Sequence, residues 1–217
     1  FFNMTTDGPN THIASYLETE DLATFHVLNK NLRTLFYKNK ALRIPYSETL
    51  MPIKFEKFEK VIIAVNIEHL KTLAQCPDLL HLEVNYETED FPVDELNGKI
   101  GPFMEVLSTM TNLTKLKIHI GFGEEIDEFN ISLLSRLTKL TELDLADNYI
   151  EDISPIQGLV QLTRLDISGM KGGHHHFLAK LTGMKELILK SVTEVDIAQL
   201  SHMHQLVKLD ISGNYIE

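Results

Sequence analysis

The chain has 217 residues, 43% of them apolar, so it can bury a full core as one elongated domain or as a small domain joined to a larger one. Its 31 acidic residues outnumber its 20 basic residues and give a net charge of -11. This excess of acids disfavours nucleic acid as a partner and favours soluble proteins with basic or polar surfaces.

Residues 10–42 have the pattern of three short helices. Asn10 and Thr19 are suitable N-caps for the first two, and Asn29 precedes the third. The apolar residues that would form the inward faces are Ile13, Tyr16, Leu17, Leu22, Phe25, Val27, Leu32, Leu35 and Phe36.

The order of the stretches IASYL, DLATFHVLNK, LRTL and KAL within residues 13–42 resembles an F-box, whose pattern runs IxxYL, DLxxLxxV, NKxxRxL and a terminal LW. This resemblance implies docking on the Skp-type linker subunit of a cullin ubiquitin ligase. The residues that would make the contact are Tyr16, Asp21, Leu22, Lys30 and Arg33. The alternative interpretation is that residues 1–50 only cap the first turn of the domain that follows, and both interpretations stay open.

A period of 22 residues dominates the second half of the chain. The pattern LxxLxLxxN begins at Leu140 and returns in register at Leu162, Met184 and Leu206, while looser copies begin at Phe58, Leu79 and Leu113. Each copy predicts a short strand in a parallel sheet and a return leg on the opposite side. In the best copy, the side chains spaced by three point inward through short helical or 3-10 turns, and Pro155 keeps that segment short. These side chains are Ile150, Ile153, Ile156, Leu159 and Leu162.

The unit LTKLTELDLADNYIEDISPIQGLVQL resembles the 22-residue class of leucine-rich repeats found in internalins and in a regulator of the type-one protein phosphatase. The resemblance implies an α/β solenoid with a parallel sheet on its concave face. We therefore predict a helical segment at 1–50 and a solenoid of about seven turns at 51–217. Asn66, Asn148 and Asn214 would form an asparagine ladder, which Met170 and Val192 interrupt.

In such a solenoid, the side chains between the apolar strand positions face the concave surface, so columns can be aligned from the sequence. The first column consists of the residue directly before the second apolar position of each repeat. Its members are Lys60, His81, Lys115, Glu142, Arg164, Glu186 and Lys208. Its last four members alternate in sign, which predicts ion pairs with a mainly structural role.

The neighbouring column runs Ile62, Glu83, Lys117, Asp144, Asp166, Ile188 and Asp210. Asp144 and Asp166 fall on adjacent strands, and their repulsion suggests that a positively charged partner approaches them. The structural alternative is that aspartate is common at this place. Ile188 is predicted to be exposed among charges and could anchor a partner. The candidate concave-face residues are His81, Glu83, Lys117, His119, Asp144, Asp166, Ile188 and Asp210, and two acidic stretches, 86–95 and 121–129, would lie beside them on one rim.

The sequence predicts no catalytic, cofactor or metal site. It contains neither a Gly-rich phosphate loop nor an HExxH motif. Three consecutive histidines, His174, His175 and His176, cannot all face one ion, and His202 and His204 lie far along the chain. We therefore expect a protein that is not an enzyme and needs neither a cofactor nor a metal.

The single cysteine, Cys76, excludes an internal disulfide, and the longest wholly apolar run, Val61 to Val65, is too short to span a bilayer. With no signal-peptide pattern at the start, we expect a cytoplasmic protein that does not bind membranes. No polar cap follows the last repeat, which predicts that further repeats or a second copy cover it. The leading hypothesis is a protein-binding adaptor that joins a ubiquitin ligase to a substrate. The alternative is a binding protein of another class, resembling a phosphatase regulator or a secreted host-interaction protein.

Overall fold

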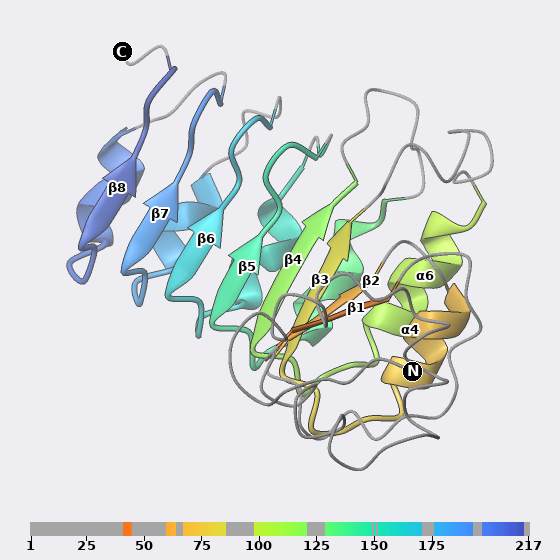
Figure 1. Cartoon of the computed structure of the whole chain (residues 1–217). Helices are drawn as coiled ribbons and strands as arrows, with labels where there is room; N and C mark the ends of the chain where they lie inside the picture. The colour runs from red at the N-terminus through yellow and green to blue at the C-terminus, as the bar shows by residue number, and fades with distance from the viewer. Residues whose placement is uncertain are drawn as a thin grey trace, which may run out of the picture.

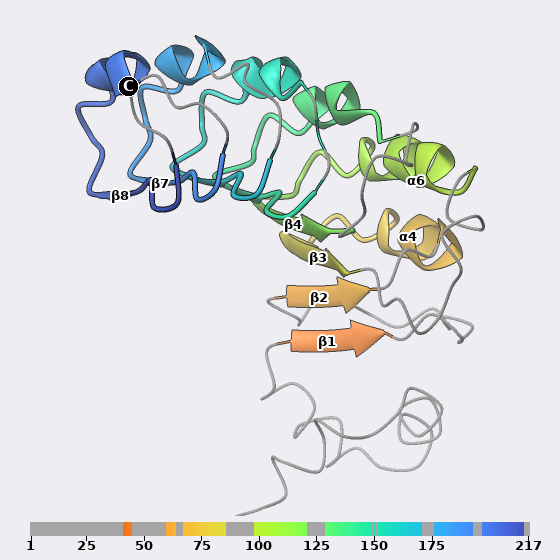
Figure 2. The same cartoon turned by 90° about the horizontal axis from the view of Figure 1, so that it is seen from above.

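The computed structural model describes residues 41–44, 60–63, 67–85, 98–120, 129–148, 150, 152–170, 176–192 and 197–214. In these ranges, eight strands form one parallel sheet whose spatial order follows the chain from β1 to β8 (Figure 1). The view from above shows the strands along the inner side of an arc and the helices along its outer side (Figure 2). This is the predicted leucine-rich-repeat solenoid.

From β2 to β8, the described strands alternate with helices along the chain. The strands are β1 (Ala41–Ile44), β2 (Lys60–Ile63), β3 (His81–Asn85), β4 (Lys115–His119), β5 (Glu142–Asp144), β6 (Arg164–Asp166), β7 (Glu186–Ile188) and β8 (Lys208–Asp210). The α-helices are α4 (Ile67–Leu73) and α6 (Ile100–Leu107), and the 3-10 helices are η1 (Ile131–Arg136), η2 (Ser154–Gly158), η3 (His176–Lys180) and η4 (Ile197–His202).

Strands β2 to β8 coincide with the seven predicted turns, but β1 was not predicted. The boundary at residue 50 assigned Ala41–Ile44 to the helical segment, whereas these residues pair with β2 in parallel. Leu42 and Ile44 lie opposite Val61 and Ile63. The strand has only four residues and no leucine pattern leads into it, so its alternating apolar residues could not be distinguished from the end of a helix.

The return legs follow the predicted spacing. Ile150, Ile153, Ile156, Leu159 and Leu162 are all buried, and Pro155 lies in the first turn of η2. The α6 leg differs because its buried residues, Ile100, Phe103, Met104 and Leu107, recur at the spacing of an α-helix. These residues belong to one hydrophobic core that continues through the successive turns.

The asparagine ladder has the predicted break. Asn148 is 3% exposed, accepts a hydrogen bond from the Ile120 amide at 2.8 Å and donates to the carbonyls of Ile118 and Leu145. It therefore joins its own turn to the preceding turn. Met170 and Val192 are buried apolar side chains at the equivalent places in the next two turns.

A second ladder, of threonines, precedes the strands and was not predicted. The hydroxyl of Thr114 donates to the Leu80 carbonyl, that of Thr141 to the Thr114 carbonyl, and that of Thr163 to the Thr141 carbonyl, each at 3.1 Å. These bonds tie consecutive turns together at the start of each strand. The recurring threonine of the LTxL pattern was the available sequence signal.

Candidate binding surface on the concave face

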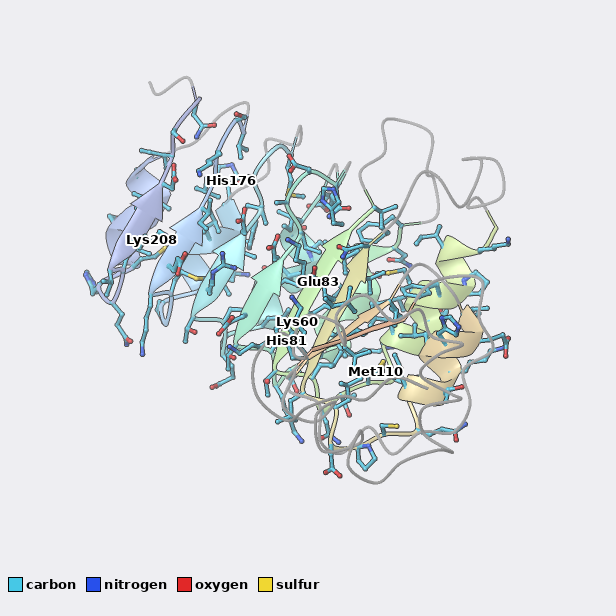
Figure 3. All side chains as sticks on the ribbon, in the orientation of Figure 1. Lys60, His81, Glu83, Met110, His176 and Lys208 are labelled. Carbon is cyan, nitrogen blue, oxygen red and sulfur yellow. The ribbon has the colours of Figure 1, made fainter. Side chains whose placement is uncertain are left out.

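The strand register aligns the two predicted columns. Val61 pairs with Leu82, so the residues directly before them, Lys60 and His81, lie side by side in the first column. The same register continues without a shift to β8. Asp144 lies opposite Asp166, as predicted, and Ile188 lies between Asp166 and Asp210. Figure 3 shows Lys60, His81 and Glu83 gathered at the β2–β3 end of the sheet and Lys208 at the other end.

The first column forms two of the ion pairs predicted for its last four members, Arg164 with Glu186 and Lys208 with Glu186, whereas Glu142 pairs with Lys115. The Lys115 ammonium lies 2.6 Å from the Glu142 carboxylate. Oε1 of Glu186 lies 3.4 Å from Arg164 Nε and 2.7 Å from Lys208 Nζ. The pKa of Glu186 is lowered, chiefly by the hydrogen bond from Lys208. These groups are partly exposed, so each pair contributes at most about 1 kcal/mol to stability.

The three aspartates of the second column each stabilise the turn after their own strand. Oδ1 of Asp144 accepts a hydrogen bond from the Ala146 amide at 3.2 Å. Asp166 and Asp210 do the same with Ser168 and Ser212, and each also accepts a hydrogen bond from the serine hydroxyl at 2.7 Å. Hydrogen bonding of a side chain to the backbone two residues ahead is the typical Asx-turn. The D-x-S and D-x-A spacing was the sequence signal for this role.

The repulsion predicted between neighbouring aspartates is offset within the chain. Oδ2 of Asp144 lies 3.6 Å from Lys117 Nζ, and Oδ2 of Asp166 lies 3.9 Å from an Arg164 nitrogen. Asp210 pairs with Lys190 at 3.0 Å. Hydrogen bonds from Ser212 and Lys190 lower the pKa of Asp210 to about 2. The like-charged neighbours therefore have internal counter-charges, which weakens the inference that an external cation must approach them.

Among the described ion-paired side chains of this face, cations and anions are equal in number. Six basic side chains pair with six acidic ones, so together they add no net charge: Lys60, Lys115, Lys117, Arg164, Lys190 and Lys208 with Glu83, Glu142, Asp144, Asp166, Glu186 and Asp210. The net charge of -11 is therefore carried by other parts of the chain.

The β2–β4 end of the face contains two histidines. His81 lies beside Lys60 and Lys115 in its column, and burial followed by the charges of these two lysines lowers its pKa. The imidazole is therefore neutral at pH 7. His119 Nδ1 lies 3.4 Å from the Ala146 carbonyl oxygen, where it could donate a hydrogen bond.

Glu83 lies next to His81 and forms an ion pair with Lys60. It also accepts a hydrogen bond from the Asn85 amide at 3.1 Å. Burial alone would raise the pKa of Glu83, but the hydrogen bonds from Lys60 and Asn85 outweigh it and lower the pKa overall. This carboxylate therefore stays charged at a half-buried position.

The prediction that Ile188 is exposed was wrong. Its side chain is only 7% exposed, although it belongs to the concave-facing column. On the neighbouring strands it lies opposite Asp166 and Asp210, whose carboxylates pair with Arg164 and Lys190. Its low exposure leaves little of this side chain for a partner to contact.

Several predicted residues lie outside the described part of the chain. These are the proposed linker-contacting residues Tyr16, Asp21, Leu22, Lys30 and Arg33, together with Asn66, His174, His175 and most of the two acidic stretches. His176 (Figure 3), His202 and His204 are exposed. Within the described ranges, no three metal-binding side chains come together. No helix described here is long and apolar enough to cross a bilayer.

Comparison with known proteins identifies the repeats. Residues 138–171 match the family model for leucine-rich repeats in two copies. No curated protein sequence matches the chain. Internalin C2 of Listeria monocytogenes is similar in structure, with a TM-score of 0.56 and 19% identity over 75% of this chain. An internalin F from the same organism gives a TM-score of 0.52 and 16% identity over 90% of this chain.

The match spans 65% of the internalin C2 chain and 68% of the internalin F chain. At these identities, the likeness concerns the fold. Together with the strand register and the buried leucine positions, it shows that the chain contains leucine-rich repeats and folds as a leucine-rich-repeat solenoid similar in structure to these internalins.

Proposed function

We propose that this chain is a protein-binding module that uses its concave face. One observation carries the proposal: seven adjacent strands, β2 to β8, align two columns of outward side chains into a continuous polar face above a buried core. At the usual spacing of neighbouring strands, that face is about 30 Å across, which suits a protein better than a small ligand. The module would act without catalysing a reaction.

The paired charges constrain the partner. A strongly basic ligand gains little from a face whose carboxylates already have internal counter-ions, and it would have to displace them. A partner with charges of both signs can instead exchange ion pairs with the columns while keeping each group satisfied. We therefore propose a protein surface of mixed charge as the ligand.

A matched pair of double variants tests the use of this face. Lys117→Glu with Arg164→Glu reverses two cations on the concave side, and Lys139→Glu with Lys180→Glu makes the same change in net charge elsewhere. Lys139 and Lys180 form hydrogen bonds with Asn112 and Gln157. Proteins captured from cells by the wild-type chain should be lost with the concave variant and retained with the control. Equal capture by both variants would refute the proposal.

The finer proposal is that the N-terminal segment docks on a Skp-type linker and makes the chain a cytoplasmic ubiquitin-ligase adaptor. It is supported by the F-box-like sequence of residues 13–42. Calorimetry with purified linker should show binding by the whole chain, and Tyr16→Ala with Arg33→Glu should abolish it. If the wild-type chain releases no heat, the adaptor role is refuted, and binding through the concave face is unaffected.

The position of β1 favours the alternative, in which the N-terminal segment only caps the solenoid. Ala41–Ile44 pairs directly with β2, so the N-terminal segment leads in sequence straight into the first described strand. Under this alternative, deleting residues 1–38 should expose the apolar core next to β1 and lower the midpoint of urea unfolding. An unchanged midpoint would exclude the capping role.

A further inference from the structure

The first column of the concave face begins with three basic residue types on adjacent strands. Lys60 of β2, His81 of β3 and Lys115 of β4 lie side by side, whereas acidic and basic residues alternate from β5 onward. The carboxylates that pair with the two lysines lie elsewhere, Glu83 in the second column and Glu142 on β5. His81 therefore has a lysine on each neighbouring strand and no acid beside it in this described column (Figure 3).

The half-buried imidazole of His81 is the neutral member of this group. The charged side chains that act on it come from all four strands of this region: Lys60 on β2, Glu83 on its own strand, Lys115 on β4 and Glu142 on β5. Burial and then the two lysines lower the pKa of His81, and the two carboxylates offset only part of that effect. The ion pairs described for this face engage both lysines but not the imidazole.

A carboxylate placed over the imidazole would supply the negative charge that this part of the column lacks. At the usual spacing, β2 and β4 are about 10 Å apart, so the long stems of Lys60 and Lys115 can both reach a group centred over β3. A nearby carboxylate favours the protonated imidazole, which can then donate a charge-assisted hydrogen bond to it. Both lysines would repel a cation at the same place.

We propose that Lys60, His81 and Lys115 form a carboxylate seat for an acidic side chain of the protein that binds the concave face, and that His81 takes up a proton from water when this seat is filled. The proposal rests on the proposed use of that face and names one group of its ligand. Because the complex holds the extra proton more tightly than the free chain does, binding should strengthen as the pH falls.

A tetraglutamate peptide with blocked ends is the probe, and its binding is followed through the ring proton signals of His81 by nuclear magnetic resonance. The peptide should shift these signals and bind at least about threefold more tightly at pH 6 than at pH 8. Its own carboxylates are ionised at both pH values, so the difference reports the protein. His81→Gln should remove the pH dependence, and His176→Gln, at an exposed histidine of η3, should preserve it.

The two lysines are tested together. Lys60→Gln with Lys115→Gln should weaken peptide binding about fivefold at both pH values, because two positive charges are lost. The matched control is Lys139→Gln with Lys180→Gln, which removes the same charge from lysines that bond to Asn112 and Gln157, and it should leave binding unchanged. Inorganic phosphate at the same concentration should not displace the peptide.

Three results would overturn the carboxylate seat: no shift of the His81 signals, a pH dependence that survives His81→Gln, or displacement of the peptide by phosphate, which would assign the site to a small free anion. The charge-reversal test of the concave face uses Lys117 and Arg164, which lie outside the seat. Proteins captured through that face, together with a peptide that does not bind, would therefore refute the seat and leave the proposed function standing.

Discussion

Replacing Asn148 with alanine should destabilise the solenoid at the joint between β4 and β5. Its side chain accepts a hydrogen bond from the Ile120 amide at 2.8 Å and donates to the Ile118 and Leu145 carbonyls at 2.6 and 2.9 Å. Alanine loses these three bonds, as well as a longer one to the Ala146 carbonyl at 3.3 Å, and leaves the Ile120 amide, in a residue that is 4% exposed, without this acceptor. At roughly 1 kcal/mol for each bond, the free energy of unfolding should fall by about 3 kcal/mol.

Asn214 provides the comparison. It makes the same kind of bonds, with the Val192 amide and the Leu189 and Ile211 carbonyls, but these bonds are only partly buried, so water can replace them in part. Asn214→Ala should therefore cost only about 1 kcal/mol. Both variants remove the same side-chain amide, so the difference between their losses in free energy of unfolding measures the effect of burying these hydrogen bonds.

Two measurements together check this prediction. Urea denaturation followed by circular dichroism gives the loss of stability, and hydrogen exchange reports the Ile120 amide directly. If opening governs exchange, a loss of about 3 kcal/mol corresponds to about 100-fold faster exchange at that amide. The reasoning is refuted if Asn148→Ala costs no more than Asn214→Ala, or if the Ile120 amide keeps its protection.

Three further substitutions test the turns, the ion pairs and the histidine. Gly169→Ala should cost about 1–2 kcal/mol in thermal unfolding, because φ is +73° and the new Cβ would lie 2.5 Å from Asp147 Oδ1, whereas Gly158→Ala, with open space around it, should change stability by less than about 0.5 kcal/mol. A larger loss for Gly158→Ala would contradict this account. Arg164→Gln, which breaks contacts with two acidic neighbours, should cost less than about 1 kcal/mol, and the loss should shrink in high salt; a loss independent of salt would point to packing. Because the pKa of His81 lies below its ordinary 6.5, the unfolded chain binds more protons near that pH, so stability should fall as the pH drops through 6.5; His81→Gln should flatten this dependence, and an identical pH profile would refute the assignment.

The period of the sequence determined the register of the sheet. A repeat of 22 residues places the same apolar positions in every turn, and one-residue slips would move them out of the core, so both concave columns could be aligned from β2 to β8. The same periodicity predicted the inward residues of the η2 return leg. The Asx-turns of Asp166 and Asp210 could also be predicted from the sequence, because they need only an aspartate whose side chain accepts from the backbone amide two residues ahead.

The tertiary structure decided what the repeat leaves unspecified. A four-residue strand such as β1 carries too little pattern to separate it from a helix end, and its place is set by pairing with β2. Ile188 is buried although its column faces the concave side, and its neighbours there, Asp166 and Asp210, come from the adjacent strands, which the sequence of β7 does not specify. Arg164 likewise forms ion pairs with Asp166 on its own strand and with Glu186 on the next strand. Which acidic residues it pairs with depends on how the strands lie beside one another. The sequence alone therefore determined which residues face the concave surface, and packing between turns decided which of them are neutralised, covered or left exposed.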